Sequence, residues 1–186
     1  MEGKNELKIK SLWKDYSKEI FAGKGDSLVD VLHKIPLFNK LNKHELKIVS
    51  KFAYERSYEP EEFVFQAGQP GAAMFMIKEG EISIVKKNNE NEFVEIARLK
   101  EGEVFGELAL LDSSPRSAGA LALTHVKAIA IFREDLNNLL ETHPDIGGRI
   151  MQYLAIITGK RLKETTNLLI QLEDKLTKLK ENCNEG

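Results

Sequence analysis

Six short β-rich segments between residues 63 and 132 constrain the fold of this chain more than any other feature. They are Phe63–Gln66, Ala73–Lys78, Glu81–Lys86, Phe93–Leu99, Gly119–Thr124 and Val126–Phe132. Glycines separate several of these segments, and apolar and polar residues alternate within them. In the stretch from Glu81 to Ile84, this alternation is typical of a half-buried strand. Short strands at even spacing predict a β jelly-roll barrel within an α+β fold.

Helical patterns flank the β-rich region on both sides. Before it, the spacing of apolar residues predicts an amphipathic helix over Glu6–Phe21, a short helix over Leu28–Ile35 and a helix that Asn42 caps and that ends near Phe52. After it, we predict a helix over Arg133–Glu141 and a long helix that begins near Pro144. The predicted barrel therefore carries helices at both of its ends in the chain.

The long C-terminal helix carries a repeat with a period of seven residues. One core position of the repeat is occupied by Ala155, Leu162, Leu169 and Leu176, and the other by Thr158, Thr165, Leu172 and Leu179. Such a repeat favours a dimeric coiled coil. The two threonines weaken its first half, so a helix that folds back on its own barrel remains the alternative.

The longest interruption of the strand pattern is Phe105–Ala118, FGELALLDSSPRSA, here called the cassette segment. Gly106 opens a short apolar helical turn whose free N–H groups can bind an anion. Arg116 follows a tight Asp-Ser-Ser-Pro turn, and its planar guanidinium can bond two oxygens of one phosphate. Glu107 can accept a hydrogen bond from a sugar hydroxyl beside that phosphate. We therefore predict a phosphate and sugar site at the mouth of the barrel.

The cassette segment resembles the phosphate-binding cassette of cyclic nucleotide-binding domains, as in kinase regulatory subunits, bacterial catabolite activators and nucleotide-gated channels. The family pattern reads Phe-Gly-Glu-Leu-Ala-Leu, a short insert, then Pro-Arg, a small residue and Ala, and it matches here at 105–110 and 115–118. The resemblance extends over about residues 35 to 145. It implies that Glu107 holds the ribose 2′-hydroxyl and Arg116 the cyclic phosphate. By the same resemblance, the other contacts come from Phe105, Gly106, Leu108, Ala109, Ser117 and Ala118.

The resemblance also bears on the base of the nucleotide. Many family members carry Thr or Ser where this chain has Gly119, which we expect to loosen the strand that follows. Ser117 is compatible with either purine, and we expect cAMP as the ligand, with cGMP as the alternative. An apolar residue of the last helix often covers the base in this family. The candidates here are Met151, Tyr153, Leu154 and Ile157.

These features divide the chain into three parts. They are an N-terminal helical segment (1–34), a cyclic nucleotide-binding domain (35–145) and a C-terminal helix (146–182). We expect a stand-alone sensor that signals through helix rearrangement to an unidentified protein partner and dimerises through its C-terminal helix. One alternative is a dimeric interaction or scaffold protein with a ligand-free barrel. Another is a relative of transcription regulators that lacks the DNA-binding domain, because few residues follow the long helix.

Composition argues against several other classes of protein. The formal net charge of −2 provides no overall positive field for direct nucleic acid binding. Lys160, Arg161 and Lys163 form a small basic patch, whose simpler interpretation is a solvated helix face. No apolar run approaches the roughly eighteen residues that span a membrane, and the N-terminus lacks the apolar core of a secretory signal. The single Cys183 excludes an internal disulfide. We therefore expect a cytoplasmic protein.

The histidines argue against an enzyme with a metal centre. They are scattered in different segments, at His33, His44, His125 and His143. A metal site needs such ligands close together. Asp112, which could pair with Glu107 for acid–base chemistry, lies in a turn where Asp commonly bonds its own backbone. We expect no metal, no cofactor other than the nucleotide ligand and no catalytic residue.

Overall fold

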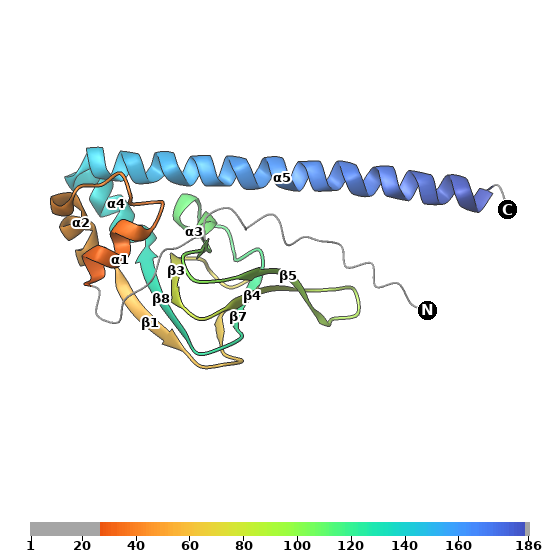
Figure 1. The fold of residues 1–186 in the computed structure, drawn as a ribbon, viewed down its shortest axis with the longest axis horizontal. Helices are drawn as coiled ribbons and strands as arrows, with labels where there is room; N and C mark the ends of the chain where they lie inside the picture. The colour runs from red at the N-terminus through yellow and green to blue at the C-terminus, as the bar shows by residue number, and fades with distance from the viewer. Residues whose placement is uncertain (1–26, 185–186) are drawn as a thin grey trace.

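Two four-stranded antiparallel sheets form the centre of the fold, with the strand orders β1-β8-β3-β6 and β2-β7-β4-β5 (Figure 1). The computed structural model describes residues 27–184. The strands are β1 (Tyr54–Tyr58), β2 (Phe63–Phe65), β3 (Ala73–Glu79), β4 (Ile82–Lys87), β5 (Phe93–Leu99), β6 (Val104–Phe105), β7 (Gly119–Ala122) and β8 (Val126–Phe132). This arrangement confirms the predicted jelly roll and the α+β class.

All six predicted strands are present, and β5 and β8 have the predicted bounds. Strands β1 and β6 were not predicted. Strand β1 has exposed residues on both faces, so it lacks an alternation of apolar and polar residues, and β6 is only two residues long. Gly119 is the first residue of β7 and pairs with Val85.

The helices cover one end of the barrel, and Figure 1 shows α5 running from that end across α3 and beyond. They are α1 (Leu28–Lys34), α2 (Lys43–Val49), the 3₁₀ turn η3 (Ser50–Phe52), α3 (Leu108–Leu111), α4 (Arg133–Thr142) and α5 (Pro144–Asn184). As predicted, Asn42 caps α2, and Glu45 completes the capping box by accepting from the Asn42 N–H at 2.8 Å. The helix predicted over residues 6–21 lies outside the described residues.

Strands β3 and β8 separate two hydrophobic cores. Met74 and Met76 of β3 face a core built with α1, α2, α4 and α5. Phe75 and Ile77, the alternating residues of the same strand, face the interior of the barrel. The helices therefore pack directly on the sheet that forms one wall of the barrel. Among residues 27–184, no helix is long and apolar enough to cross a membrane.

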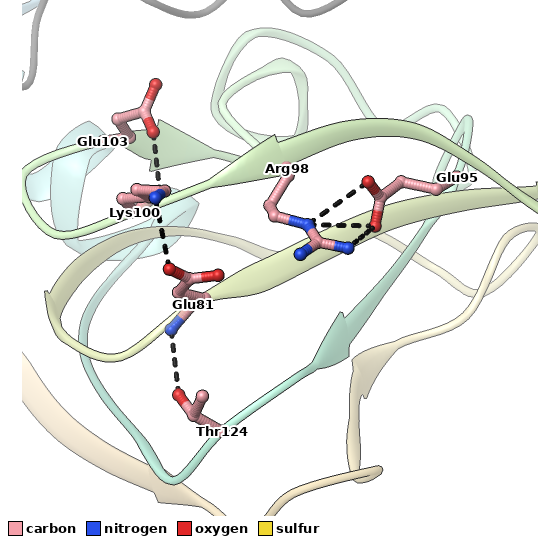
Figure 2. A network of polar contacts seen from close by, with 6 residues as sticks. All are labelled: Glu81, Glu95, Arg98, Lys100, Glu103 and Thr124. Carbon is pink, nitrogen blue, oxygen red and sulfur yellow. Dashed lines mark hydrogen bonds and ion pairs between the residues drawn. The ribbon is translucent and has the colours of Figure 1, made fainter. Parts of the chain in front are cut away.

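Polar contacts lie on the outer face of β4 and β5 (Figure 2). Ser83 lies opposite Arg98 and is only 2% exposed, and its hydroxyl donates to Glu95 at 2.7 Å. The predicted alternation of β4 is correct in direction, because Ile82 and Ile84 face the barrel core and Ser83 does not, but the outward residue Ser83 is buried rather than exposed. Arg98 pairs with Glu95 at 3.1 Å.

Further contacts join the turns at one end of these strands (Figure 2). The Glu81 N–H donates to Thr124 Oγ1 at 3.0 Å, and Lys100 Nζ lies 3.3 Å from the Glu81 carboxylate. The Lys100 N–H donates to the buried Glu103 at 2.6 Å, and burial raises the pKa of that carboxyl. These contacts fix the turn before β6, the strand that leads into the cassette segment.

The burial of α5 predicts different costs for two substitutions on the same helix. Leu154 is fully buried in the helical core, whereas Ile156 is 54% exposed. We expect Leu154→Ala to lower the free energy of unfolding by about 2–5 kcal/mol because it opens a cavity. We expect Ile156→Ala to change it by less than about 0.5 kcal/mol. Urea unfolding of both variants tests this, and equal losses would contradict the packing of α5.

Candidate functional site

A cavity of about 500 Å³ lies between the barrel, the cassette segment and α5. Phe65, Ile84 and Ile96 form its apolar wall on the barrel side. All eight residues that the sequence analysis assigned to a ligand line this cavity. They are Phe105, Gly106, Glu107, Leu108, Ala109, Arg116, Ser117 and Ala118. The structure therefore brings the predicted site residues together around one space.

Gly106 has to be glycine for two reasons. Its φ of 69° lies in the left-handed region, which other residues seldom adopt. A Cβ atom at this position would also lie 2.6 Å from Nη1 of Arg116 and 3.3 Å from the Phe65 ring. The missing side chain thus allows the guanidinium of Arg116 to approach the backbone of the cassette segment.

The Arg116 guanidinium is held from several sides. Its Nη1 donates to the Gly106 carbonyl at 3.1 Å and its Nη2 to the Ala73 carbonyl at 2.6 Å. The Phe65 ring centroid lies 4.0 Å from its central carbon, a cation–π distance. Its backbone N–H also donates to Gln69 O at 2.8 Å. This environment fixes the position of the cation beside the cavity.

The same guanidinium retains one unsatisfied group. Its Nε is buried and has no hydrogen-bond partner among the described residues. Burial lowers the pKa of Arg116, and the charge of the neighbouring Arg133 lowers it further. An anion in the cavity would offset both effects, because it would accept hydrogen bonds and supply the opposite charge.

Glu107 is a buried carboxylate, 5% exposed, at the start of α3. It forms an ion pair with Arg161 of α5, whose Nη2 also donates to the Val104 carbonyl at 2.8 Å. The interpretation of Arg161 as part of a solvated helix face is therefore wrong. The seven-residue repeat identifies apolar positions of α5 such as Leu162, but it does not indicate the role of a charged residue. Arg161, the residue before Leu162, also lines the cavity. The partner of Glu107 is far away in the sequence, and no local pattern indicates it.

The amides of α3 are partly engaged within the turn. The Ala109 N–H donates to Gly106 O at 3.2 Å, and the Leu110 N–H donates to Glu107 O at 2.9 Å. The helical turn expected after Gly106 is therefore present, but as only four residues. The amide of Ala109, one of the residues predicted to contact the ligand, therefore has an internal acceptor in this structure.

Helix α5 covers the cavity with residues other than the four predicted candidates. The lining residues of α5 are Thr158, Arg161, Leu162 and Thr165. Leu154 is instead part of the core beneath the N-terminal helices, and Met151 and Tyr153 pack against that core. The apolar residue that α5 places in the cavity wall is Leu162.

Asp112, which also lines the cavity, has structural hydrogen-bond partners. Asp112 accepts hydrogen bonds from the Ser114 hydroxyl at 2.7 Å and the Ser114 N–H at 3.1 Å, and these bonds lower the pKa of the carboxyl. Within residues 27–184, no three His, Cys, Asp or Glu residues gather in a way that could hold a metal ion.

The ion pair between Glu107 and Arg161 predicts a strong coupling in stability. The side chains are 7% and 20% exposed, respectively, so removing one partner leaves a largely buried charge. We expect Arg161→Met to lower the free energy of unfolding by about 3 kcal/mol. The loss should shrink in the double variant with Glu107→Gln, because no charge is then left unpaired. Urea unfolding of the single and double variants measures this coupling.

A neighbouring lysine provides the control. Lys160→Met removes a cation that lies 3.9 Å from Glu164 on the same helix and is more exposed. We expect a change below about 1 kcal/mol. Additive losses in the Arg161 and Glu107 variants would show that the two side chains are not coupled.

Comparison with known proteins agrees with this geometry. Residues 55–143 match the family model of the cyclic nucleotide-binding domain. The cyclic AMP receptor protein of Thermus thermophilus is 30% identical over 129 residues, which cover 69% of this chain and 58% of that protein. The crystal structure of the Thermus thermophilus catabolite activator protein has a TM-score of 0.67 at 30% identity, over 74% of this chain and 63% of that one.

A further solved structure supports the fold alone. A cyclic nucleotide-binding domain from Methylobacillus flagellatus KT has a TM-score of 0.68 at 22% identity, over 77% of this chain and 81% of that one. The chain spans less than two thirds of the length of the Thermus thermophilus proteins it matches. The match to the family model, the jelly roll and the cassette segment lead to one conclusion: this chain carries a domain of the cyclic nucleotide-binding domain family.

Proposed function

We propose that the cavity binds a cyclic nucleotide, cAMP in preference to cGMP, and that the chain is a regulatory sensor. The observation that carries the proposal is the Arg116 guanidinium, which is held beside the cavity with a buried Nε that has no acceptor among the described residues. A cavity of about 500 Å³ also falls within the usual range of small-ligand sites, roughly 300–1,000 Å³.

Each part of the nucleotide has a counterpart in the cavity. The cyclic phosphate bonds Arg116, where its charge also reduces the repulsion between Arg116 and Arg133. The ribose hydroxyl donates to Glu107, which has two carboxylate oxygens and can keep an arginine partner on one of them. The base packs against the apolar side of the cavity, where Ile84, Ile96 and Leu162 lie.

Two ion pairs of α5 support a signalling role for this helix. Arg161 ties α5 to Glu107 in the cavity, and Arg149 ties it to Glu45 of α2. A ligand that changes the environment of Glu107 therefore acts on the helix that also holds the N-terminal helices. We propose that the position of α5 reports ligand binding to a protein partner.

We also propose that the chain is not an enzyme and acts in the cytoplasm. In the cavity, Glu107 pairs with Arg161, and Arg116 donates to the Gly106 carbonyl. These groups are not arranged as a nucleophile beside a general base. The chain has a single cysteine, which fits a reducing compartment.

Replacing Arg116 by Ala tests the ligand proposal. We expect wild-type protein to bind cAMP in a calorimetric titration, and Arg116→Ala to weaken binding at least about tenfold, because a charge-assisted contact with the phosphate is lost. The matched control is Arg98→Ala, since Arg98 pairs with Glu95 on the outer face of β5. A parallel titration with cGMP tests the base preference.

The result also separates the sensor from a ligand-free interaction protein. A ligand at a hundredfold excess over its dissociation constant raises the free energy of unfolding by about 2.7 kcal/mol. The absence of any thermal shift with cAMP or cGMP would favour the interaction protein. Unchanged affinity in Arg116→Ala would remove Arg116 from the site.

We further propose that α5 forms a homodimer beyond the barrel. Leu169 and Leu176 are each 57% exposed and lie seven residues apart, which is the spacing of a coiled-coil seam. Changing both to Glu should convert the dimer to a monomer in analytical ultracentrifugation. The control changes Gln171 and Lys178 to Glu, two exposed positions with the same spacing near the opposite face of the helix. A monomer in the wild type would contradict the dimer.

A further inference from the structure

The first residue of α4 lies against the cassette segment, although the sequence analysis gave it no role. Arg133 donates through Nε to the Ala109 carbonyl at 2.6 Å, and through Nη2 to the Gly71 carbonyl. Its backbone N–H donates to Ala72 O at 2.8 Å. Arg133 therefore bridges the cassette segment and the chain that enters β3.

A second guanidinium bridges the same two parts of the chain. Arg116 donates to Gly106 O of the cassette segment and to Ala73 O at the start of β3. One arginine thus holds the beginning of the turn at residue 106, and the other holds its middle at residue 109. At the chain that enters β3, Arg116 donates to the carbonyl of residue 73 and Arg133 donates to the carbonyl of residue 71.

The two parts of the chain also approach each other closely. A Cβ atom on Gly71 would lie 2.9 Å from the Ala109 Cβ and 3.5 Å from Arg116 Nε. No side chain can separate them at this point. The guanidinium groups therefore supply the polar contacts of a packed junction, where unpaired carbonyls would be costly.

The two arginines differ in their access to the ligand. Arg116 lines the cavity, whereas Arg133 is not among its lining residues. A phosphate that takes up the hydrogen bonds of Arg116 competes with the Gly106 and Ala73 carbonyls for the same N–H groups. Arg133 faces no such competition, so we expect its bridge to Ala109 and Gly71 to persist when the ligand is bound.

We propose that Arg133 is a positioning residue, which holds the cassette segment on the start of β3 while Arg116 turns to the phosphate of the ligand. This inference rests on the proposed cyclic nucleotide binding. It assigns the two neighbouring cations separate tasks, since Arg116 contacts the ligand and Arg133 acts only through the backbone of the cassette segment. It also joins the ligand site to the first residue of α4.

Arg133→Met and Arg133→Lys test the proposal. Methionine keeps much of the apolar stem but donates to neither carbonyl, whereas lysine can still donate to one of them. We expect the dissociation constant for cAMP to rise about tenfold in Arg133→Met and about threefold in Arg133→Lys. Amide hydrogen exchange of the ligand-free protein should become faster in residues 106–112 and stay slow in β3 and β8. Arg98→Met, on the outer face of β5, should change neither quantity.

The exchange pattern separates a positioning role from a general loss of stability. Faster exchange throughout the chain, unchanged exchange in residues 106–112, or a dissociation constant within twofold of wild type would each overturn the proposal. If wild-type protein fails to bind cAMP, the proposed function is wrong. In that case, amide hydrogen exchange in the ligand-free variants is the remaining test of whether Arg133 holds the cassette segment.

Discussion

The partial burial of the Arg116 guanidinium is the constraint on which the candidate site depends. A partly buried cation needs acceptors for its N–H groups, and here the carbonyls of Gly106 and Ala73 provide them. Those carbonyls are within reach only because residue 106 has no side chain and a left-handed φ. The Phe65 ring covers the cation on the barrel side. The sharp turn of the cassette segment and the cavity beside it therefore follow from placing this one charge.

Helix α5 passes through three different environments along its length. Its first part, with Ile146, Ile150 and Leu154, is buried in the helical core. The next turns contribute to the cavity, and Arg161 pairs there with Glu107. Farther on, Leu169 and Leu176 are exposed. Because these parts belong to one continuous helix, no loop intervenes between the cavity and the exposed end.

Much of the fold could be predicted because its signals are local. Glycines and alternating residues identified strands such as β5 and β8, and the motif around Arg116 identified the residues that the cassette segment contributes to the cavity. The pairing of Arg161 with Glu107 could not be predicted, since it depends on where α5 lies across the barrel. The contacts of Arg133 could not be predicted either, because its partners are backbone carbonyls, which every residue has. Contacts between distant segments were thus the missing part.

In the proposed mechanism, Glu107 contacts both the ligand and α5, so the signal can be described as a coupling free energy between ligand binding and the position of α5. One carboxylate binds α5 through Arg161 and, in the proposed complex, accepts a hydrogen bond from the sugar of the ligand. If the ligand changes the strength of the ion pair, it changes the stability of the position that α5 adopts. A partner that binds one position of α5 must then change the affinity for the ligand by the same factor, because coupling between two binding sites is reciprocal. The direction of the signal is set by whether the bound sugar strengthens or weakens the hold of Glu107 on α5.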